Sequence, residues 1–226
     1  ANQRCLDLQS NYPYQLLTDD LGNQVLHFTF ENLAPYASRI ISIKASLLVS
    51  RFANPIAAVP MPADMKAQKY IESEHPDIKR LARKLNGSDP SEVIDQILHW
   101  VKANVRYSGY SSKDRGALYA LKNRKGDCTE YMDLFVALCR ANGVPARPVG
   151  GYICPENTVL NTKSYHNWAE FYEGGIWHIA DPQNHVLRQN QSDYIAMRII
   201  RAPEDNGLEP YYRFRVKGEG LQIRMN

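Results

Sequence analysis

The order of apolar and polar positions divides the chain into a β-rich first part and a mixed helical and β remainder. In the first part, aliphatic, β-branched and aromatic residues gather in short runs of the kind that form strands. From Ile41 to Val49 most apolar residues alternate with polar ones, which predicts a strand with one buried face. The predicted strands cover residues 12–17, 25–30 and 40–49. We therefore expect a small antiparallel β-layer that ends near Phe52 and is followed by an irregular, proline-rich connection.

Apolar residues then recur at helical spacing in several segments. Helices are predicted over residues 76–85, 90–101 and, as a short helix, 116–121. The clearest helix start lies after Gly126, because Asp127 followed three residues later by Glu130 is typical of a capping box. This helix should begin at Cys128 and end where Gly143 supplies a stop signal.

The segments that follow this helix are read mainly as strands. They cover residues 145–152, 164–173 and 176–181, with 191–200 helical or mixed and a terminal hairpin formed by 211–216 and 221–225. The pair Gly174-Gly175 suits a two-residue hairpin turn that sets Glu173 opposite Ile176. In this register His166 and Asp181 project from the same face as diagonal neighbours, about 7–8 Å apart at the backbone. A slip of one residue would place them on opposite faces.

Cys128, His166 and Asp181 together have the chemistry of an activated thiol. In the first turn of a helix, backbone N–H groups and the helix dipole favour negative charge, and thiolate is the nucleophilic form of cysteine. An imidazole can activate the thiol, and a carboxylate can hold the ring in one tautomer. The alternative for Cys128 alone is a small buried hydrophobe; the histidine and aspartate downstream favour catalysis.

Several further blocks of sequence accompany these three residues. The blocks are Gly126-Asp127-Cys128, Arg140 to Arg147, His166-Asn167-Trp168-Ala169-Glu170, Trp177 and Ala180-Asp181-Pro182. In order and spacing they resemble the core of the transglutaminase-like superfamily, over roughly Tyr70 to Asp193. The resemblance implies an α+β, papain-like fold in which a nucleophile helix packs on an antiparallel sheet, here preceded by the small β-layer. It also implies Cys128 as nucleophile, His166 as base and Asp181 as the orienting aspartate.

One aromatic residue ahead of the nucleophile matches the same pattern. Tyr107 resembles a family position that lines the cleft, and its hydroxyl is a candidate to assist the backbone N–H of Cys128 in an oxyanion hole. The alternative is that Tyr107 anchors its loop by packing. His178 is expected to be a packed histidine, and His185 is not expected to be catalytic.

Length and composition limit the classes of protein that this chain can belong to. With 226 residues it suits one domain with an appendage, so we expect residues 1–60 to form a β-rich extension packed on the core and residues 61–226 to form the catalytic core with its terminal hairpin. The net charge of +3 is spread among interspersed charges, so no nucleic-acid partner is expected. No apolar run could span a membrane and no signal peptide is present, which leaves the compartment open and is compatible with an exported mature form.

The four cysteines include no C-x-x-C pair, which disfavours a zinc ribbon or a thioredoxin-like motif. Cys139 lies on roughly the same stripe of the helix as Cys128 and is read as core. A disulfide between Cys5 and Cys154 is the one pairing considered, and the sequence does not settle it.

The function predicted from these residues is acyl transfer on amide or peptide bonds through a thioester, with a protein or peptide substrate and no metal or organic cofactor. Hydrolysis is ranked first, because compact bacterial-looking members of the family suggest peptidase or amidase activity. The alternatives are a cross-linking protein-glutamine transamidase and a catalytically silent binding module on the same scaffold. A relative of the peptide N-glycanases is disfavoured by the missing C-x-x-C motifs. Substrate identity and oligomeric state stay open.

Overall fold

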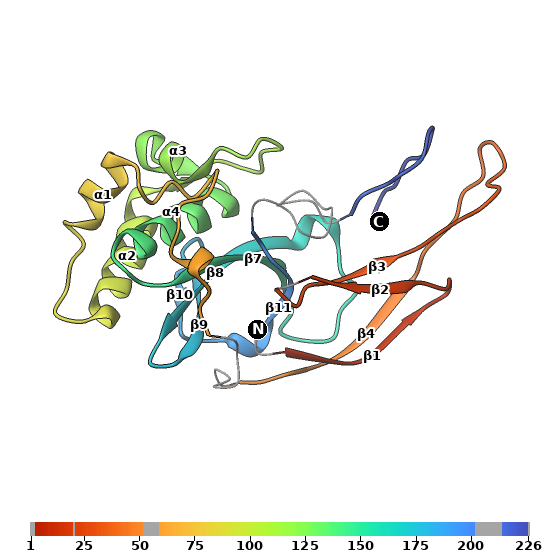
Figure 1. The fold of residues 1–226 in the computed structure, drawn as a ribbon, viewed down its shortest axis with the longest axis horizontal. Coiled ribbons are helices and arrows are strands. Elements are labelled where there is room, and N and C mark those ends of the chain that lie inside the picture. The colour runs from red at the N-terminus through yellow and green to blue at the C-terminus, as the bar shows by residue number, and fades with distance from the viewer. Residues whose placement is uncertain (1–2, 20, 52–58, 202–213, 226) are drawn as a thin grey trace.

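A five-stranded antiparallel sheet with helices packed against it forms the larger part of the molecule, and a β-rich N-terminal part extends to one side (Figure 1). The computed structural model describes residues 3–19, 21–51, 59–201 and 214–225. Its helices are α1 (Pro76–Ala82), α2 (Pro90–Asn104), α3 (Gly116–Asn123) and α4 (Cys128–Ala141). The strands of the large sheet are β7 (Ala146–Ile153), β8 (Tyr165–Glu173), β9 (Ile176–Asp181), β10 (Val186–Leu187) and β11 (Tyr194–Ile199). The predicted α+β class is confirmed.

The large sheet has the strand order β10-β9-β8-β7-β11, and each neighbouring pair is antiparallel. The β8–β9 hairpin turns at Gly174 and Gly175, whose φ angles of 59° and 87° suit residues without a Cβ. Its register pairs Glu173 with Ile176, as predicted. Position 166 near the start of β8 and position 181 at the end of β9 therefore lie at the same end of the sheet.

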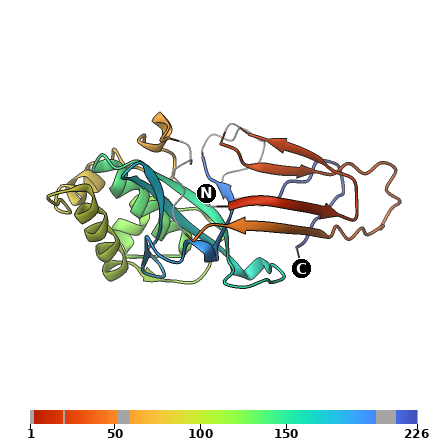
Figure 2. The same cartoon turned by 90° about the horizontal axis from the view of Figure 1, so that it is seen from below.

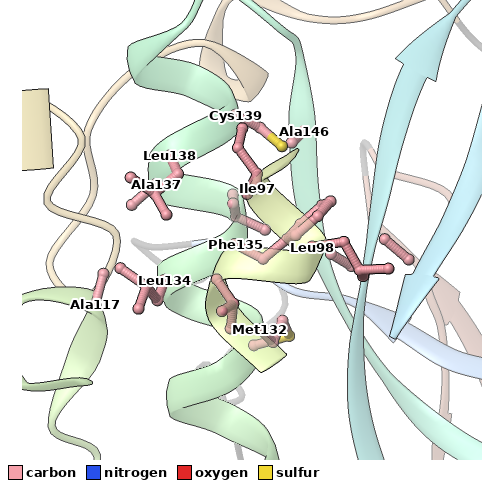
Figure 3. Packing of buried hydrophobic residues seen from close by; sticks show 14 of the residues in the cluster. Ile97, Leu98, Ala117, Met132, Leu134, Phe135, Ala137, Leu138, Cys139 and Ala146 are labelled. Atoms are coloured by element: carbon pink, nitrogen blue, oxygen red, sulfur yellow. The ribbon is translucent and has the colours of Figure 1, made fainter. Parts of the chain in front are cut away.

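Helix α4 lies at the centre of the core. Every residue from Thr129 to Arg140 is buried, and α1, α2 and α3 pack against the helix. On the sheet side, Phe135 contacts Phe171 of β8 with ring centroids 6.3 Å apart. Figure 3 shows the apolar side chains that fill the space between α4, α2 and β7. A helix buried on all sides has a fixed axis and rotation, so this packing sets the position of its first residue, Cys128.

The N-terminal part contains two separate two-stranded sheets that extend away from the helices (Figure 2). Strand β1 (Gln3–Ser10) pairs with β4 (Ile43–Val49), and β2 (Gln15–Thr18) pairs with β3 (Gln24–His27). Strand β1 was not predicted, because its sequence has no β-branched residue. The predicted buried face of β4 is wrong: Ile43 is 54% exposed, and only the far end of the strand is half-buried.

Two side-chain amides join this N-terminal part to β11, the edge strand of the large sheet. Gln3 donates from Nε2 to the carbonyl of Ala196 at 2.6 Å and accepts from its N–H at 2.7 Å. Asn23 binds the carbonyl and N–H of Ile199 in the same way, at 2.9 and 2.7 Å. Each amide replaces a strand partner and satisfies backbone groups of an edge. From these contacts we propose that residues 1–60 form an extension packed on the core, although 1–2, 20 and 52–58 lie outside the described residues.

Of the two predictions for the C-terminal part, one agrees with the structure and the other does not. Residues 191–200, predicted as helical or mixed, are mixed: a 3-10 turn at Gln191–Asp193 leads into β11. The predicted terminal hairpin is wrong for the part that the structure describes, since 214–225 contain a turn at 218–220 but no strand. Residues 211–213 of that prediction lie outside the described residues. No described helix has both the length and the apolar character needed to cross a membrane.

Candidate active site

The helix that carries Cys128 begins at a turn fixed by a capping box, as predicted. Strand β6 (Lys125–Gly126) leads into the turn, and α4 begins at Cys128. The Asp127 carboxylate accepts the N–H of Thr129 at 2.9 Å, and the Glu130 carboxylate accepts the N–H of Asp127 at 2.9 Å. A side chain at position 126 would collide with Glu130, so glycine is required for this tight turn. Cys128 itself is half-buried.

A second set of contacts braces the same turn from the preceding loop. Arg115 donates from its guanidinium to Glu130 at 2.6 Å, and Glu130 is only 1% exposed. The other oxygen of the Asp127 carboxylate accepts the N–H of Ser111 at 2.8 Å. The carboxylates of the capping box therefore satisfy N–H groups of both the helix and the loop, which stabilises the nucleophile turn.

His166 and Asp181 meet at the end of the β8–β9 hairpin, as the predicted register required. Nε2 of His166 lies 2.7 Å from Oδ2 of Asp181, which is completely buried. Burial alone would raise the pKa of the Asp181 carboxyl, but hydrogen bonds from His166 and Asn184 lower it below its usual value. The carboxylate is therefore ionised at neutral pH, and it can hold the imidazole in one orientation.

The thiol of Cys128 is the second partner of the His166 ring. Burial by itself would lower the pKa of His166, but hydrogen bonds and charge interactions with Asp181 and Cys128 raise it to about 9. Since Nε2 faces Asp181, Nδ1 is the nitrogen left for the thiol. The structure thus brings together all three residues that the sequence singled out, in the order sulfur, imidazole and carboxylate.

One hydrogen bond that the sequence gave no reason to expect ties the nucleophile helix to β8. Asn167 donates from Nδ2 to Oγ1 of Thr129 at 2.9 Å, and both residues are buried. Thr129 directly follows Cys128, and Asn167 directly follows His166. The bond therefore fixes the distance between the two elements that carry the thiol and the imidazole. Asn167 lies in the block His166 to Glu170 that resembles the family, but its role becomes visible only from its contact with Thr129 in the structure.

Two more residues that the sequence reasoning missed bind Asp181. Asn184 donates from Nδ2 to Oδ2 at 2.7 Å and from its backbone N–H to Oδ1 at 3.1 Å. Tyr194 donates from its hydroxyl to Oδ2 at 2.9 Å. Asn184, three residues after Asp181, could have been recognised as a turn residue that bonds back to the aspartate. Tyr194 has no local signal, because it comes from a different strand.

The other candidates lie nearby but have less direct contacts. Tyr107 is in β5 (Arg106–Tyr107), which pairs in parallel with β6, so that Tyr107 lies opposite Gly126. Its side chain is 53% exposed beside the nucleophile turn. His178 stacks on Phe171 with ring centroids 5.5 Å apart, which agrees with packing. His185 makes an edge contact with His99 at 5.0 Å.

The remaining cysteines lie outside this site. All four cysteines have free thiols, so the disulfide considered for Cys5 and Cys154 is not formed. Cys139 is fully buried in α4, and burial raises the pKa of its thiol far above the usual value. Within the described ranges, no group of three or more His, Cys, Asp or Glu side chains could hold a metal ion.

Comparisons with known proteins identify relatives by sequence and by fold. An uncharacterized protein of Mycobacterium leprae is 26% identical over 181 residues, which are 76% of this chain and 60% of that protein. The chain thus spans about 60% of the length of this relative. A crystal structure of a Cytophaga hutchinsonii protein proposed to be a cysteine protease has a TM-score of 0.60 and 20% identity, covering 88% of this chain and 71% of that one. The periplasmic domain of TgpA from Pseudomonas aeruginosa has a TM-score of 0.46 and 19% identity, over 82% and 69% of the two chains.

The structural likeness to the Cytophaga protein concerns the fold alone. The model of the transglutaminase-like superfamily matches residues 79–182. This range begins in α1 and runs to the end of the β8–β9 hairpin, and it includes Cys128, His166 and Asp181. The match confirms the resemblance stated from the sequence: residues 79–182 of this chain are similar to the core of the transglutaminase-like superfamily.

Proposed function

We propose that this protein is a cysteine-dependent acyl-transfer enzyme that acts on amide or peptide bonds, with Cys128 as nucleophile. The observation that carries the proposal is the His166 ring held between a buried carboxylate and the thiol at a helix start. In this arrangement the thiol attacks, the imidazole moves protons and Asp181 orients the imidazole. The match of residues 79–182 to the transglutaminase-like superfamily supports the same chemistry.

The reaction proceeds in two halves. In the first, Sγ of Cys128 bonds to the carbonyl carbon, the thiol proton passes to His166, and the amine leaves with that proton as the C–N bond breaks. In the second, water attacks the thioester, His166 takes a proton from the water, and the C–S bond breaks to release a carboxylic acid and regenerate the thiol. Asp181 stays ionised throughout and stabilises the charged imidazolium.

The oxyanion formed in each half needs donors close to the thiol. The N–H of Thr129 is bound to the Asp127 carboxylate, so we assign the backbone N–H of Cys128 as the first donor. One such donor contributes about 3–4 kcal/mol to transition-state stabilisation. Tyr107, on the strand beside Gly126, is the candidate for the second donor. Turnover by Tyr107→Phe tests this assignment: an unchanged rate would assign Tyr107 to packing instead.

Hydrolysis and transamidation share the thioester and differ only in the acceptor. We rank hydrolysis first because water needs no binding site of its own, and cross-linking of glutamine to a primary amine is the runner-up. Mass spectrometry of glutamine peptides incubated with the protein and a primary amine separates them. Cleaved or deamidated peptide without amine adduct supports hydrolysis, and an amine adduct supports transamidation.

The reactivity of the thiol tests the proposal without a known substrate. Cys154 is half-buried like Cys128 but lies outside the site, so it serves as an internal control. We expect iodoacetamide to alkylate Cys128 much faster than Cys154 at mildly acidic pH, and this difference should disappear in His166→Ala. A Cys128 thiol that reacts no faster than free cysteine would favour a catalytically silent binding module. A peptide-derived mass increase on Cys128, absent from Cys128→Ala, would identify the acyl-enzyme.

A further inference from the structure

The face of the large sheet opposite α4 carries a contact that crosses several strands. Tyr194 belongs to β11, and Asp181 to β9, with β8 and β7 between them in the sheet order. Tyr194 nevertheless places its hydroxyl 2.9 Å from Oδ2 of Asp181. The tyrosine is 5% exposed, and its ring packs edge-on against Trp168 of β8 at 5.1 Å between centroids. A buried hydroxyl that reaches a buried carboxylate in this way is a specific contact.

A glycine on the strand between them makes room for the contact of Tyr194 with Asp181. Gly151 of β7 pairs with His166 of β8, so a side chain on Gly151 would point to the face that carries His166 and Trp168. A Cβ there would lie 2.7 Å from Cη2 of Trp168 and would also collide with the carbonyl oxygen of Ile195. The glycine therefore leaves room for the ring of Trp168, against which Tyr194 packs while its hydroxyl reaches Asp181.

Asn184 completes the surroundings of the carboxylate from the other side. Its side-chain amide lies 2.7 Å from Oδ2 and its backbone N–H 3.1 Å from Oδ1. Together with Nε2 of His166, Asp181 therefore has four hydrogen-bonding contacts, three of them to Oδ2. A carboxylate this deeply buried loses all solvation by water, so such donors decide whether it stays ionised.

We propose that Tyr194 and Asn184 are positioning residues that keep Asp181 ionised and aimed at Nε2 of His166. The inference rests on the proposed function, in which Asp181 orients the imidazole. With Nε2–H donated to Asp181, Nδ1 is presented to the thiol of Cys128. A carboxylate that rotated or took up a proton would release the ring from this orientation.

Few other titratable groups face this cluster. Cys128 reaches His166 from α4, and Asp193 precedes Tyr194 in the chain and acts on it through its charge. Burial, followed by the charge of Asp181, raises the pKa of the Tyr194 hydroxyl well above its usual value. The hydroxyl therefore keeps its proton and stays a donor at neutral and acidic pH.

The test follows the hydrogen bond itself and needs no substrate. In histidine-labelled protein, the Nε2 proton of His166 should give a downfield NMR signal while Asp181 is ionised. We expect this signal to be lost on acidification about one pH unit higher in Tyr194→Phe than in the wild type, the shift expected for one lost charge-assisted hydrogen bond. Loss at the same pH in both proteins would overturn the inference.

Two variants complete the design. Tyr152→Phe removes a buried tyrosine hydroxyl of β7 that contacts the sulfur of Met225, away from Asp181, so its NMR titration should match the wild type. Asn184→Ala changes an exposed residue and carries the same test if Tyr194→Phe does not fold, with the same upward shift expected. If the NMR midpoint shifts in the variant but the wild type turns over no substrate, only the proposed function is refuted. If the wild type turns over substrate but the midpoint does not shift, only the positioning role is refuted.

Discussion

Two substitutions of Glu130 should show how much its helix cap and its ion pair each contribute to the free energy of unfolding. Glu130 caps the N–H of Asp127 and pairs with Arg115, and it is 1% exposed. Glu130→Gln keeps an acceptor for the cap but removes the charge. Breaking a fully buried ion pair costs about 3–5 kcal/mol. The Arg115 side chain is 23% exposed and can be partly solvated, so we expect about 1–2 kcal/mol.

Glu130→Ala removes the cap as well, which adds about 1 kcal/mol and brings the expected total to about 2–3 kcal/mol. Urea unfolding followed by circular dichroism measures both variants. Glu92 is the matched control, because it contacts the N-terminal turn of α2 in a similar way but at an exposed position. If Glu130→Ala and Glu92→Ala unfold at the same urea concentration, the buried contacts of Glu130 do not stabilise the nucleophile turn.

Three further predictions concern the pH dependence and the packing around the site. The pKa of His166 is raised from 6.5 to about 9, so its contribution to the free energy of unfolding is fully present below pH 6.5 and is lost as the pH rises through 9. Urea titrations at a series of pH values should show this decline in the wild type but not in His166→Asn. Gly151→Ala should lower the free energy of unfolding by about 1–3 kcal/mol, since its Cβ collides with Trp168, and an unchanged midpoint would contradict the packing. Arg147→Ala leaves the buried Glu170 carboxylate unpaired and should cost about 3–5 kcal/mol, a loss that the additional Glu170→Leu change should partly restore.

The sequence was sufficient wherever the signal is local. The capping box at Asp127 predicted the first residue of α4, and Gly174-Gly175 predicted the register that places His166 near Asp181. Both signals depend on backbone geometry within a few residues, so they can be recognised without knowledge of distant contacts.

Predictions failed where burial, strand formation or a site contact depends on residues far away in the sequence. The alternating pattern of β4 indicated a buried face, but burial depends on a second layer that the sequence of the strand does not encode. Strand β1 forms without β-branched residues because β4 pairs with it along most of its length. In the site, Tyr194 was unpredictable for the same reason: it reaches Asp181 across β7 and β8, and Gly151 of β7 leaves room for the contact.

Local and distant contacts have different roles in the site. The three residues proposed for catalysis come from a helix start and the two strands of one hairpin, so each is placed by its own element. Apolar packing sets the position of α4 on the sheet, and two long-range hydrogen bonds, Asn167 to Thr129 and Tyr194 to Asp181, add to it within the site. Changes at these positions should therefore leave helix and hairpin intact and alter the geometry between thiol and imidazole. The proposed activity should be more sensitive to them than the fold is.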